Sequence, residues 1–252
     1  MNLSGKVLLV TGGSRGIGRA IALLCAQHGA RVAVHYYQNQ EAAEDTLGVI
    51  GGSGHSAFRA DLADPEATRR LVESVIVEMG TIDILVNNAG VFEPHPVSET
   101  GYDEWLHAWN TTLATNLLGA ANASYCASRH MMDHGGGRIV NISSRGAFRG
   151  EPDAPAYGAS KAGMNAMSQS LAKALAPHGI FVYVVAPGWV ETEMAEPYLS
   201  GPGGPEVLNQ SPMKRVATPE EIARVVLFLA SEAPEYMTGC IVDVNGASYL
   251  RT

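Results

Sequence analysis

The sequence predicts an α/β fold, in which helices cover both faces of one doubly wound parallel sheet of about seven strands. Short apolar runs without polar alternation recur along the chain, which is typical of strands that are buried on both faces of a parallel sheet. Helical stretches separate these runs, so strand and helix alternate from end to end. The 252 residues are 46% hydrophobic and 17% charged, which suits one large domain with its own core. We therefore expect a single domain over residues 1–252.

Each expected strand is one of these apolar runs. In chain order they are KVLLVTGG (6–13), RVAVHYY (31–37), HSAFRA (55–60), IDILVNNAG (82–90), GRIVNISS (137–144), IFVYVVAPG (180–188) and CIVDVNG (240–246). Two of the helices between them have recognisable starts. Asp64 with Pro65 predicts an N-cap followed by a proline in the first turn. Thr218 with Glu221 predicts a capping box at the start of another helix.

Two long irregular stretches, 92–104 and 191–215, each follow an expected strand. In open α/β sheets ligands bind beyond the carboxyl ends of the strands, so both stretches are expected to rim a site. The second contains SGPGGP, whose glycines and prolines favour a lid that takes its shape when a ligand binds. We expect mostly apolar pocket walls without a carboxylate clamp, formed by Phe92, His95, Phe148, Met194, Tyr198 and Leu199.

Charge and cysteine content exclude several classes of protein. A formal net charge of −8 argues against nucleic acid or an anionic membrane as a partner, because both need clustered Lys and Arg. Cys25, Cys126 and Cys240 are an odd, widely spaced set without a CxxC pair, which disfavours disulfides and structural zinc. The apolar run near the N-terminus is too short for a signal peptide. We expect a cytoplasmic protein, or one of an organelle stroma or matrix if a transit peptide was removed, that acts on a small molecule.

No metal site is expected. His130 and His134 have the i, i+4 spacing of metal ligands on a helix, but no further ligand cluster accompanies them. A pair of histidines at a helix end, where the dipole favours positive charge, is the interpretation we adopt.

A glycine-rich turn follows the first expected strand, in TGGSRGIG at residues 11–18. Gly12, Gly16 and Gly18 allow a tight turn and let the backbone come close to a pyrophosphate, which then lies on the N-terminal amides of the next helix. The spacing differs by one residue from the usual dinucleotide fingerprint. Its position after the first strand still favours a dinucleotide site.

A tyrosine and a lysine lie one helical turn apart in PAYGASKAG, residues 155–163. Positions i and i+4 share a helix face, so Tyr157 and Lys161 point into the same space. An ammonium about 4 Å from the phenol favours phenolate by roughly 4 kcal/mol at an effective dielectric of 20, so we expect Lys161 to lower the Tyr157 pKa toward 7. A pair of this kind also occurs in ordinary helices, and the rest of the chain decides between the two interpretations.

Six motifs follow one another in the order found in the short-chain dehydrogenases/reductases. They are TGGSRGIG, NNAG at 87–90, Asn116 in TNLLG, NISS at 141–144, Tyr157 with Lys161, and PGWVET at 187–192. The resemblance covers nearly the whole chain and is greatest to the 3-oxoacyl-acyl-carrier-protein reductase branch. It implies a Rossmann-type sheet and hydride transfer between a nicotinamide cofactor and a carbonyl or alcohol.

The resemblance also implies the catalytic residues. Tyr157 corresponds to the general acid or base, and Lys161 to the residue that lowers its pKa and holds the nicotinamide ribose. Ser144 corresponds to the hydroxyl that polarises the substrate carbonyl. Ser143 is the neighbouring candidate, but in an extended segment the two serines face opposite sides. Asn116 corresponds to the asparagine that holds a water linking Lys161 to solvent.

The residue at the end of the second strand governs cofactor choice. Relatives that prefer NAD carry an acidic residue there, whereas this chain has Tyr36, followed by Tyr37 where many NADP-using relatives have arginine. Arg15 can reach a 2′-phosphate, so NADPH is the expected cofactor and NAD is not excluded. The implied cofactor-binding residues are Gly12, Ser14, Arg15, Gly16, Ile17, Gly18, Tyr36, Tyr37, Asp61, Leu62, Asn88, Ala89, Gly90, Tyr157, Lys161, Pro187, Gly188, Val190 and Thr192.

Three classes of function remain open at this stage. The first is an NADPH-dependent carbonyl reductase or alcohol dehydrogenase. The second is a 3-oxoacyl-acyl-carrier-protein reductase of fatty-acid synthesis, although Gly135 and His178 stand where such enzymes often have basic residues. The third is a dinucleotide-binding protein without activity. Relatives assemble through the helices around Asn116 and after Tyr157, so a homotetramer or homodimer is expected.

Overall fold

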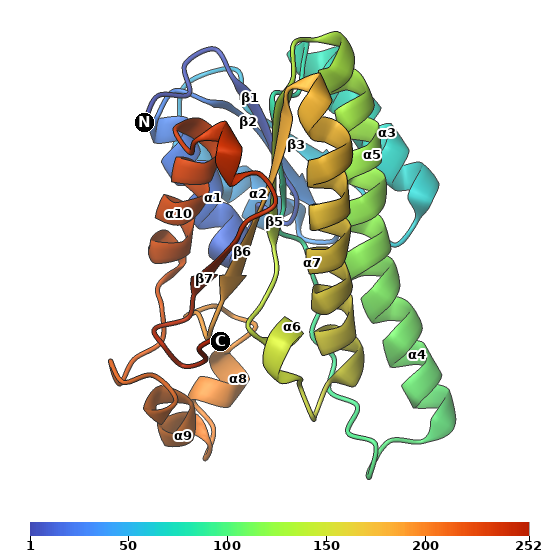
Figure 1. Cartoon of the computed structure of the whole chain (residues 1–252), viewed down its shortest axis with the longest axis vertical. Coiled ribbons are helices and arrows are strands. Elements are labelled where there is room, and N and C mark those ends of the chain that lie inside the picture. The colour runs from blue at the N-terminus through green and yellow to red at the C-terminus, as the bar shows by residue number, and fades with distance from the viewer. Residues whose placement is uncertain (252) are drawn as a thin grey trace.

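Seven parallel strands form one sheet in the computed structural model, which describes residues 1–251 (Figure 1). Along the sheet the strands are ordered β3-β2-β1-β4-β5-β6-β7. All six neighbouring pairs are parallel, which confirms the predicted class of sheet. The strands are β1 Val7–Val10, β2 Arg31–Tyr36, β3 Ser56–Arg59, β4 Ile84–Asn87, β5 Gly137–Ile142, β6 Ile180–Pro187 and β7 Ile241–Val244.

Helices cover both faces of this sheet (Figure 1). One face is covered by α1 Gly16–Gln27, α2 Gln40–Ile50 and α10 Pro219–Ser231. The other is covered by α3 Pro65–Met79, α5 Ala120–Asp133 and α7 Pro155–Leu175. On this second face, α4 Tyr102–Leu113 continues into α5 through one π-helical segment, η1 Ala114–Gly119. Short 3₁₀ turns, η2 Ala176–His178 and η3 Glu235–Met237, follow α7 and α10.

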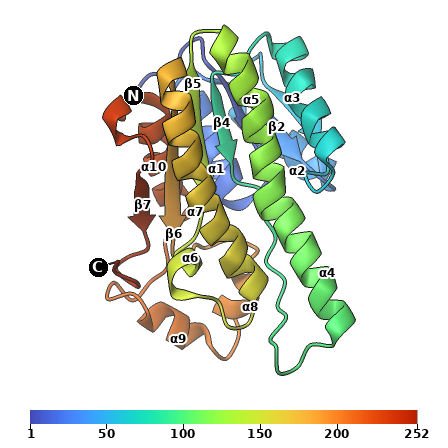
Figure 2. The ribbon, with the colours of Figure 1, turned by 45° about the vertical axis from the view of Figure 1, so that its right-hand side comes forward.

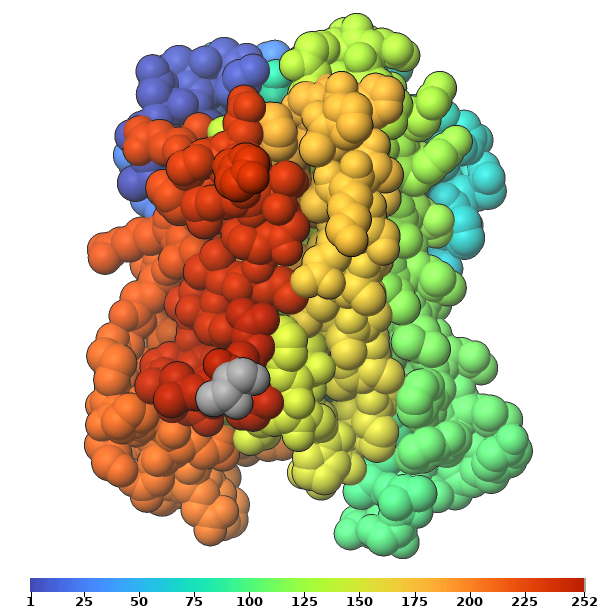
Figure 3. Space-filling view, in the orientation of Figure 1, coloured from blue at the N-terminus to red at the C-terminus, as the bar shows by residue number. Residues whose placement is uncertain are grey.

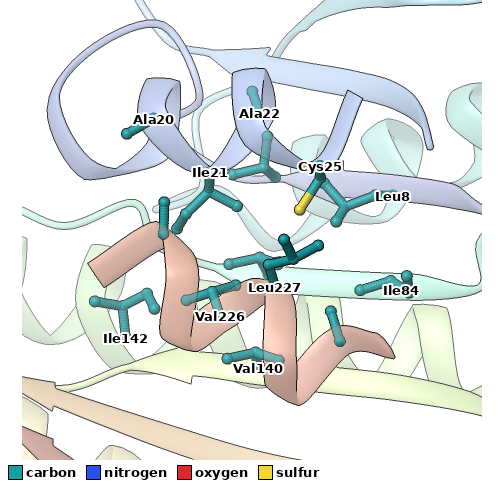
Figure 4. Close-up of a cluster of buried hydrophobic side chains, with 14 of the residues drawn as sticks. Leu8, Ala20, Ile21, Ala22, Cys25, Ile84, Val140, Ile142, Val226 and Leu227 are labelled. Atoms are coloured by element: carbon teal, nitrogen blue, oxygen red, sulfur yellow. The ribbon is translucent and has the colours of Figure 1, made fainter. Parts of the chain in front are cut away.

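Two buried apolar clusters bind the helices to the sheet. In the first, Ile21 and Cys25 of α1 face Val226 and Leu227 of α10. Leu8 of β1 belongs to the same cluster and joins these helices to the sheet (Figure 4). The second lies on the opposite face and joins β1 and β4 to α3, α5 and α7. Each fully buried Leu, Ile or Val contributes about 1.5 to 3 kcal/mol relative to its exposed state. Burial also raises the pKa of the Cys25 thiol to about 12, so Cys25 acts as a small apolar side chain.

The two predicted helix starts are confirmed. Asp64 is the N-cap of α3, where its Oδ1 accepts a hydrogen bond from the Glu66 amide at 2.9 Å, and Pro65 is the first helical residue. At the start of α10, Thr218 Oγ1 accepts from the Glu221 amide at 3.4 Å. Glu221 Oε2 accepts in return from the Thr218 amide at 2.9 Å. Both helices begin where the capping residues satisfy amides that have no partner within the helix.

Three short helices gather at the end of the molecule toward which the arrows of β6 and β7 point (Figure 2). They are α6 Gly146–Arg149, α8 Glu196–Leu199 and α9 Gly204–Asn209. The last two belong to the stretch 191–215, which therefore contains regular turns as well as loops. Among the described residues, no helix is both long and apolar enough to span a bilayer.

Candidate active site

The glycine turn between β1 and α1 forms a cradle that only small residues fit. Gly12 and Gly16 have φ angles of 62° and 52°, which lie in the left-handed region. A Cβ on Gly18 would lie 2.1 Å from the Gly12 carbonyl oxygen and 2.5 Å from Asn88 Nδ2. The first turn of α1 contains no acidic residue, and the residue before it provides no side-chain cap, so its amides remain available to an anion. These features fit the pyrophosphate of a dinucleotide.

A histidine that the sequence analysis did not select supports this turn. His35 of β2 is 2% exposed, and its Nδ1 accepts a hydrogen bond from the Gly12 amide at 3.0 Å. Its Nε2 lies 3.2 Å from the Ala60 carbonyl oxygen, so the neutral ring donates there. Burial lowers the pKa of His35 to about 4, although the Ala60 hydrogen bond and the Asp61 charge act in the opposite direction. His35 is therefore neutral near pH 7 and connects the glycine turn to β3.

The end of β4 is tied to the end of β1 through the side chains of Asn88 and Thr11. Asn88 Nδ2 donates to the Thr11 and Gly12 carbonyl oxygens at 3.0 and 3.1 Å. Thr11 Oγ1 accepts from the amides of Asn88 and Ala89 at 2.9 and 3.0 Å. A Cβ on Gly90 would lie 3.6 Å from Lys161 Nζ, so NNAG connects the glycine turn to α7.

At the other side of the turn lie the residues that were expected to select the cofactor. Tyr36 ends β2 and is 8% exposed, whereas Tyr37 is 47% exposed. Arg15 Nη1 forms an exposed ion pair with Glu193 Oε2 at 3.1 Å. Arg59, which the sequence analysis did not select, donates from Nε to the Tyr37 carbonyl oxygen at 3.1 Å. Arg59 therefore borders the β2–α2 turn, whereas the Arg15 side chain is directed to Glu193 in the segment after β6.

The remaining cofactor candidates occupy less direct positions. Asp61 is half-buried, and its Oδ1 accepts from the Ala63 amide at 2.9 Å, while Leu62 is buried at 5% exposure. Ser14 contributes its carbonyl oxygen to Thr46 Oγ1 at 3.2 Å. Ile17 packs partly against the apolar cluster between α1 and α10.

The segment after β6 comes back to the glycine turn. Gly188 donates its amide to the Val244 carbonyl oxygen at 3.0 Å, directly after Pro187 ends β6. Val190 pairs with Ala217 in an isolated parallel bridge. A Cβ on Gly16 would lie 3.2 Å from Thr192 Cγ2, so Thr192 lies over the start of α1.

Tyr157 and Lys161 lie on one face at the start of α7, with Lys161 Nζ 5.7 Å from the centre of the Tyr157 ring. Nζ donates to the Ile142 carbonyl oxygen at 2.7 Å, and burial lowers the Lys161 pKa to about 8. Burial raises the Tyr157 pKa to about 12, and a hydrogen bond with Ser144 offsets only part of that rise. The prediction that Lys161 lowers the Tyr157 pKa toward 7 is therefore wrong for the protein without ligand, because desolvation dominates.

The two serines after β5 face different groups. Ser143 is 3% exposed, and its Oγ donates to the Lys161 carbonyl oxygen at 3.3 Å on the back of α7. The Ser144 hydroxyl lowers the pKa of Tyr157, and its Oγ accepts from the Gly146 amide at 3.0 Å. Of the two hydroxyls, Ser144 is the one beside the phenol.

Asn116 lies within the π-helical segment η1 and is fully buried. Its Oδ1 accepts from the Val91 amide at 2.8 Å, and its Nδ2 donates to the Val91 carbonyl oxygen at 3.0 Å and to Ser160 Oγ at 3.2 Å. The side chain therefore holds the loop after NNAG against α7. A π-turn inside a helix is frequent at functional sites because it shifts the register of the backbone groups.

Aromatic rings pack in front of Tyr157. The rings of Phe92 and Tyr157 meet edge to face at 5.0 Å, and those of Phe92 and Tyr198 at 5.7 Å. Tyr198 also packs on Trp189 at 5.4 Å. Phe92 and Tyr198 therefore match the expected apolar wall, and they come from the two predicted loops.

Two other expected wall residues have different partners. His95 is 1% exposed and accepts from the Ala156 amide at 3.1 Å, so it supports the start of α7. Phe148 stacks on Tyr249 at 6.5 Å and lies under the Arg251 guanidinium at 4.5 Å, so the C-terminal segment covers it. His130 and His134 stack on each other at 3.8 Å, and within residues 1–251 no group of metal ligands gathers.

Comparison with known proteins identifies the family. A solved structure of a short-chain type dehydrogenase/reductase from Mycobacterium marinum is 32% identical and superposes with a TM-score of 0.89 over 99% of this chain and 98% of its own. This chain is a short-chain dehydrogenase/reductase. A putative short-chain alcohol dehydrogenase from Sinorhizobium meliloti 1021 is 36% identical, with a TM-score of 0.90 over 98% and 97% of the two chains.

Curated proteins of the expected branch are among the relatives of this short-chain dehydrogenase/reductase. A family model described as enoyl-(acyl carrier protein) reductase matches residues 12–247. The 3-oxoacyl-acyl-carrier-protein reductase FabG of Escherichia coli (strain K12) is 38% identical over 99% of this chain and 100% of its own length. The protein of that name from Staphylococcus aureus (strain N315) is 37% identical over 97% and 98%. The chain is accordingly an oxidoreductase of this family.

Proposed function

We propose that this short-chain dehydrogenase/reductase transfers a hydride between NADPH and the carbonyl group of a free small molecule, or the reverse with the alcohol. One observation carries the proposal. Ser144, Tyr157 and Lys161 lie together beside a glycine cradle that fits a dinucleotide. Hydroxyl, phenol and ammonium are the groups that this reaction needs around a carbonyl.

The glycine turn and the N-terminus of α1 would hold the pyrophosphate, and Lys161 the nicotinamide ribose. NADPH is preferred over NADH in this proposal because Tyr36 replaces the carboxylate that selects a ribose hydroxyl. Arg59 borders the same turn, and Arg15 of the glycine turn, once released from Glu193, would supply a second positive charge for a 2′-phosphate. Val190 and Thr192 would contact the carboxamide.

When bound, the nicotinamide supplies the hydride. Ser144 Oγ polarises the carbonyl oxygen, and Tyr157 donates its phenolic proton to that oxygen as negative charge develops. A pKa near 12 keeps Tyr157 protonated at neutral pH, which is the form that can donate. Lys161, with its pKa near 8, provides positive charge behind the phenol, and Asn116 fixes the loop that contacts Lys161.

The segment 191–215 acts as a lid in this proposal. Tyr198 from the lid meets Phe92, which packs on Tyr157, and the two rings would exclude water from hydride transfer. The exposed ion pair between Arg15 and Glu193 joins the lid to the glycine turn. A phosphate that binds Arg15 competes with Glu193 and so couples cofactor binding to lid position.

Assembly as a homotetramer or homodimer is part of the proposal. In Figure 3 the residues of α7 form a continuous column on the surface, between the C-terminal residues and the α4–α5 segment. Its exposed side chains include Ala159, Ala162 and Ala166, whose small size allows a second helix to approach closely. Cytoplasmic location is supported by the free thiols of the three cysteines, which fit a reducing compartment.

A second candidate is a 3-oxoacyl-acyl-carrier-protein reductase, which the identity of 37–38% to curated proteins of that name favours. A panel of ketones, diketones and sugars, tested beside acetoacetyl thioesters with NADPH, separates the two. Reduction of free carbonyl compounds at least as efficiently as the thioesters supports our proposal. A strong preference for acyl-carrier-protein thioesters over every free carbonyl compound supports the second candidate.

A further inference from the structure

A buried arginine without an acidic partner follows Ser144 directly. Arg145 is 3% exposed, and its Nη1 is buried without a hydrogen-bond partner among the described residues. Its Nη2 bonds the side-chain oxygen of Gln210 from the lid, and its backbone amide bonds Pro187. None of the ion pairs found within residues 1–251 includes Arg145. Burial of an unpaired charge costs several kcal/mol, which points to a missing anionic partner.

A cavity of about 160 Å³ lies against this arginine. A second unpartnered donor, the buried indole Nε1 of Trp189, belongs to a side chain that lines the same cavity. A water molecule occupies about 30 Å³ of liquid, so the space accommodates a group of several heavy atoms. Both unpartnered atoms are hydrogen-bond donors, and an ordinary ligand for two such donors is a pair of carboxylate oxygens.

The other charged residues of the cavity wall neutralise each other. Arg215 forms two hydrogen bonds of 2.7 Å with the carboxylate of Glu221. Outside the lining, the charge of Glu151 raises the Arg145 pKa, but Glu151 already forms an ion pair with Arg149 at 3.2 Å. Arg145 thus leaves one uncompensated positive charge, which matches a single carboxylate.

The cavity is connected to Ser144 and Tyr157 through two of its lining residues and is distinct from the dinucleotide cradle. Arg145 is the chain neighbour of Ser144, so the two Cα atoms are about 3.8 Å apart. Trp189 packs on Tyr198, which forms the wall in front of Tyr157. The lining of the cavity includes no residue of the glycine turn.

We propose that this cavity binds a carboxylate through Arg145 and Trp189. The carboxylate belongs either to the carbonyl substrate itself, which rests on the proposed function, or to a separate small acid. The sequence offered no carboxylate clamp because nothing in its local pattern marks Arg145 as buried and unpaired.

A binding measurement and a kinetic measurement test the proposal and separate the two sources. The first compares the melting temperature of the full chain in sodium acetate and in sodium chloride at equal ionic strength. The second compares kcat/KM with NADPH for acetoacetate and for its methyl ester, which carry the same ketone. Each is made on wild type, Arg145→Met and Arg149→Met. Arg149 ends α6, the short helix that Arg145 precedes as N-cap residue, but it has its own acidic partner, so it is the matched control.

If the carboxylate belongs to the substrate, acetate raises the melting temperature of wild type, and kcat/KM is about 10- to 100-fold higher for acetoacetate than for its methyl ester. This ratio corresponds to a charged hydrogen bond of about 1.5 to 3 kcal/mol. Arg145→Met abolishes both effects, and Arg149→Met preserves them. An acetate effect that depends on Arg145, without acid preference, supports the site with a separate acid as its occupant. Because the acid-to-ester ratio is taken within each variant, a general loss of activity cancels.

Trp189→Phe keeps an aromatic ring and removes only the indole donor, so it weakens the same effects if Arg145→Met does not fold. The proposal is overturned if neither effect depends on Arg145 or Trp189. If none of the carbonyl compounds tested supports NADPH oxidation, the proposed function is contradicted. The acetate measurement then still decides whether the cavity binds a carboxylate.

Discussion

Lowering the pH should reduce the free energy of unfolding because it protonates His35, the buried ring that accepts a hydrogen bond from the Gly12 amide. Its pKa is about 4 in the folded chain against an ordinary 6.5. The neutral ring is therefore favoured by folding, so its contribution to stability is complete above about pH 6.5 and falls as the pH drops toward 4. At 1.36 kcal/mol per pKa unit the whole contribution is roughly 3 kcal/mol, and about 2 kcal/mol of it is lost between pH 7.5 and pH 5.

The variant His35→Asn isolates this contribution. Asn offers an acceptor to the Gly12 amide but does not titrate. Urea unfolding near pH 7.5 and near pH 5 should show a loss of stability with acid that is about 2 kcal/mol smaller in His35→Asn than in wild type. His107 is exposed on α4, so His107→Asn controls for the replacement of a histidine in general. Equal acid sensitivity in wild type and His35→Asn would refute the assignment of His35 as a buried neutral ring.

Three further predictions concern the proposed catalytic serine, the proposed cofactor and assembly. Ser144→Ala should lower kcat/KM by about 10²- to 10³-fold, because an oxyanion donor is lost. Ser143→Ala should change kcat/KM less than tenfold. If an NADPH oxidation assay shows a larger loss for Ser143→Ala than for Ser144→Ala, our choice of serine is contradicted. Wild type should have a higher kcat/KM with NADPH than with NADH, and Tyr36→Asp should narrow or invert that ratio by repelling the 2′-phosphate. A wild type that prefers NADH rules out our cofactor assignment. Light scattering at micromolar concentration should give a dimer or tetramer, and a monomer disproves the assembly.

Features set by local patterns could be predicted from the sequence. The apolar runs gave the parallel sheet because strands with two buried faces need no polar alternation. The starts of α3 and α10 were predictable because a cap and its amide lie within three residues of each other. The close approach of Gly18 to Gly12 could be predicted because the spacing of the glycines already indicates a tight turn.

Features set by packing between distant segments could not be predicted. The π-helical turn at Asn116 depends on bonds to Val91 and to α7, and no local propensity in ATNLLG marks it. The high pKa of Tyr157 depends on its burial, which does not follow from an i, i+4 spacing. Arg145 looks like an ordinary loop cation in the sequence, and only the fold buries it.

The central claim is that Tyr157 donates the proton in NADPH-dependent carbonyl reduction. Its most direct test is the turnover of Tyr157→Phe beside its affinity for NADPH, measured by NADPH oxidation and by NADPH fluorescence. Turnover should fall by about 10² to 10⁴, the usual contribution of general acid catalysis, while the affinity stays close to that of wild type because the glycine turn is unchanged. A variant that keeps more than about a tenth of wild-type turnover contradicts the claim.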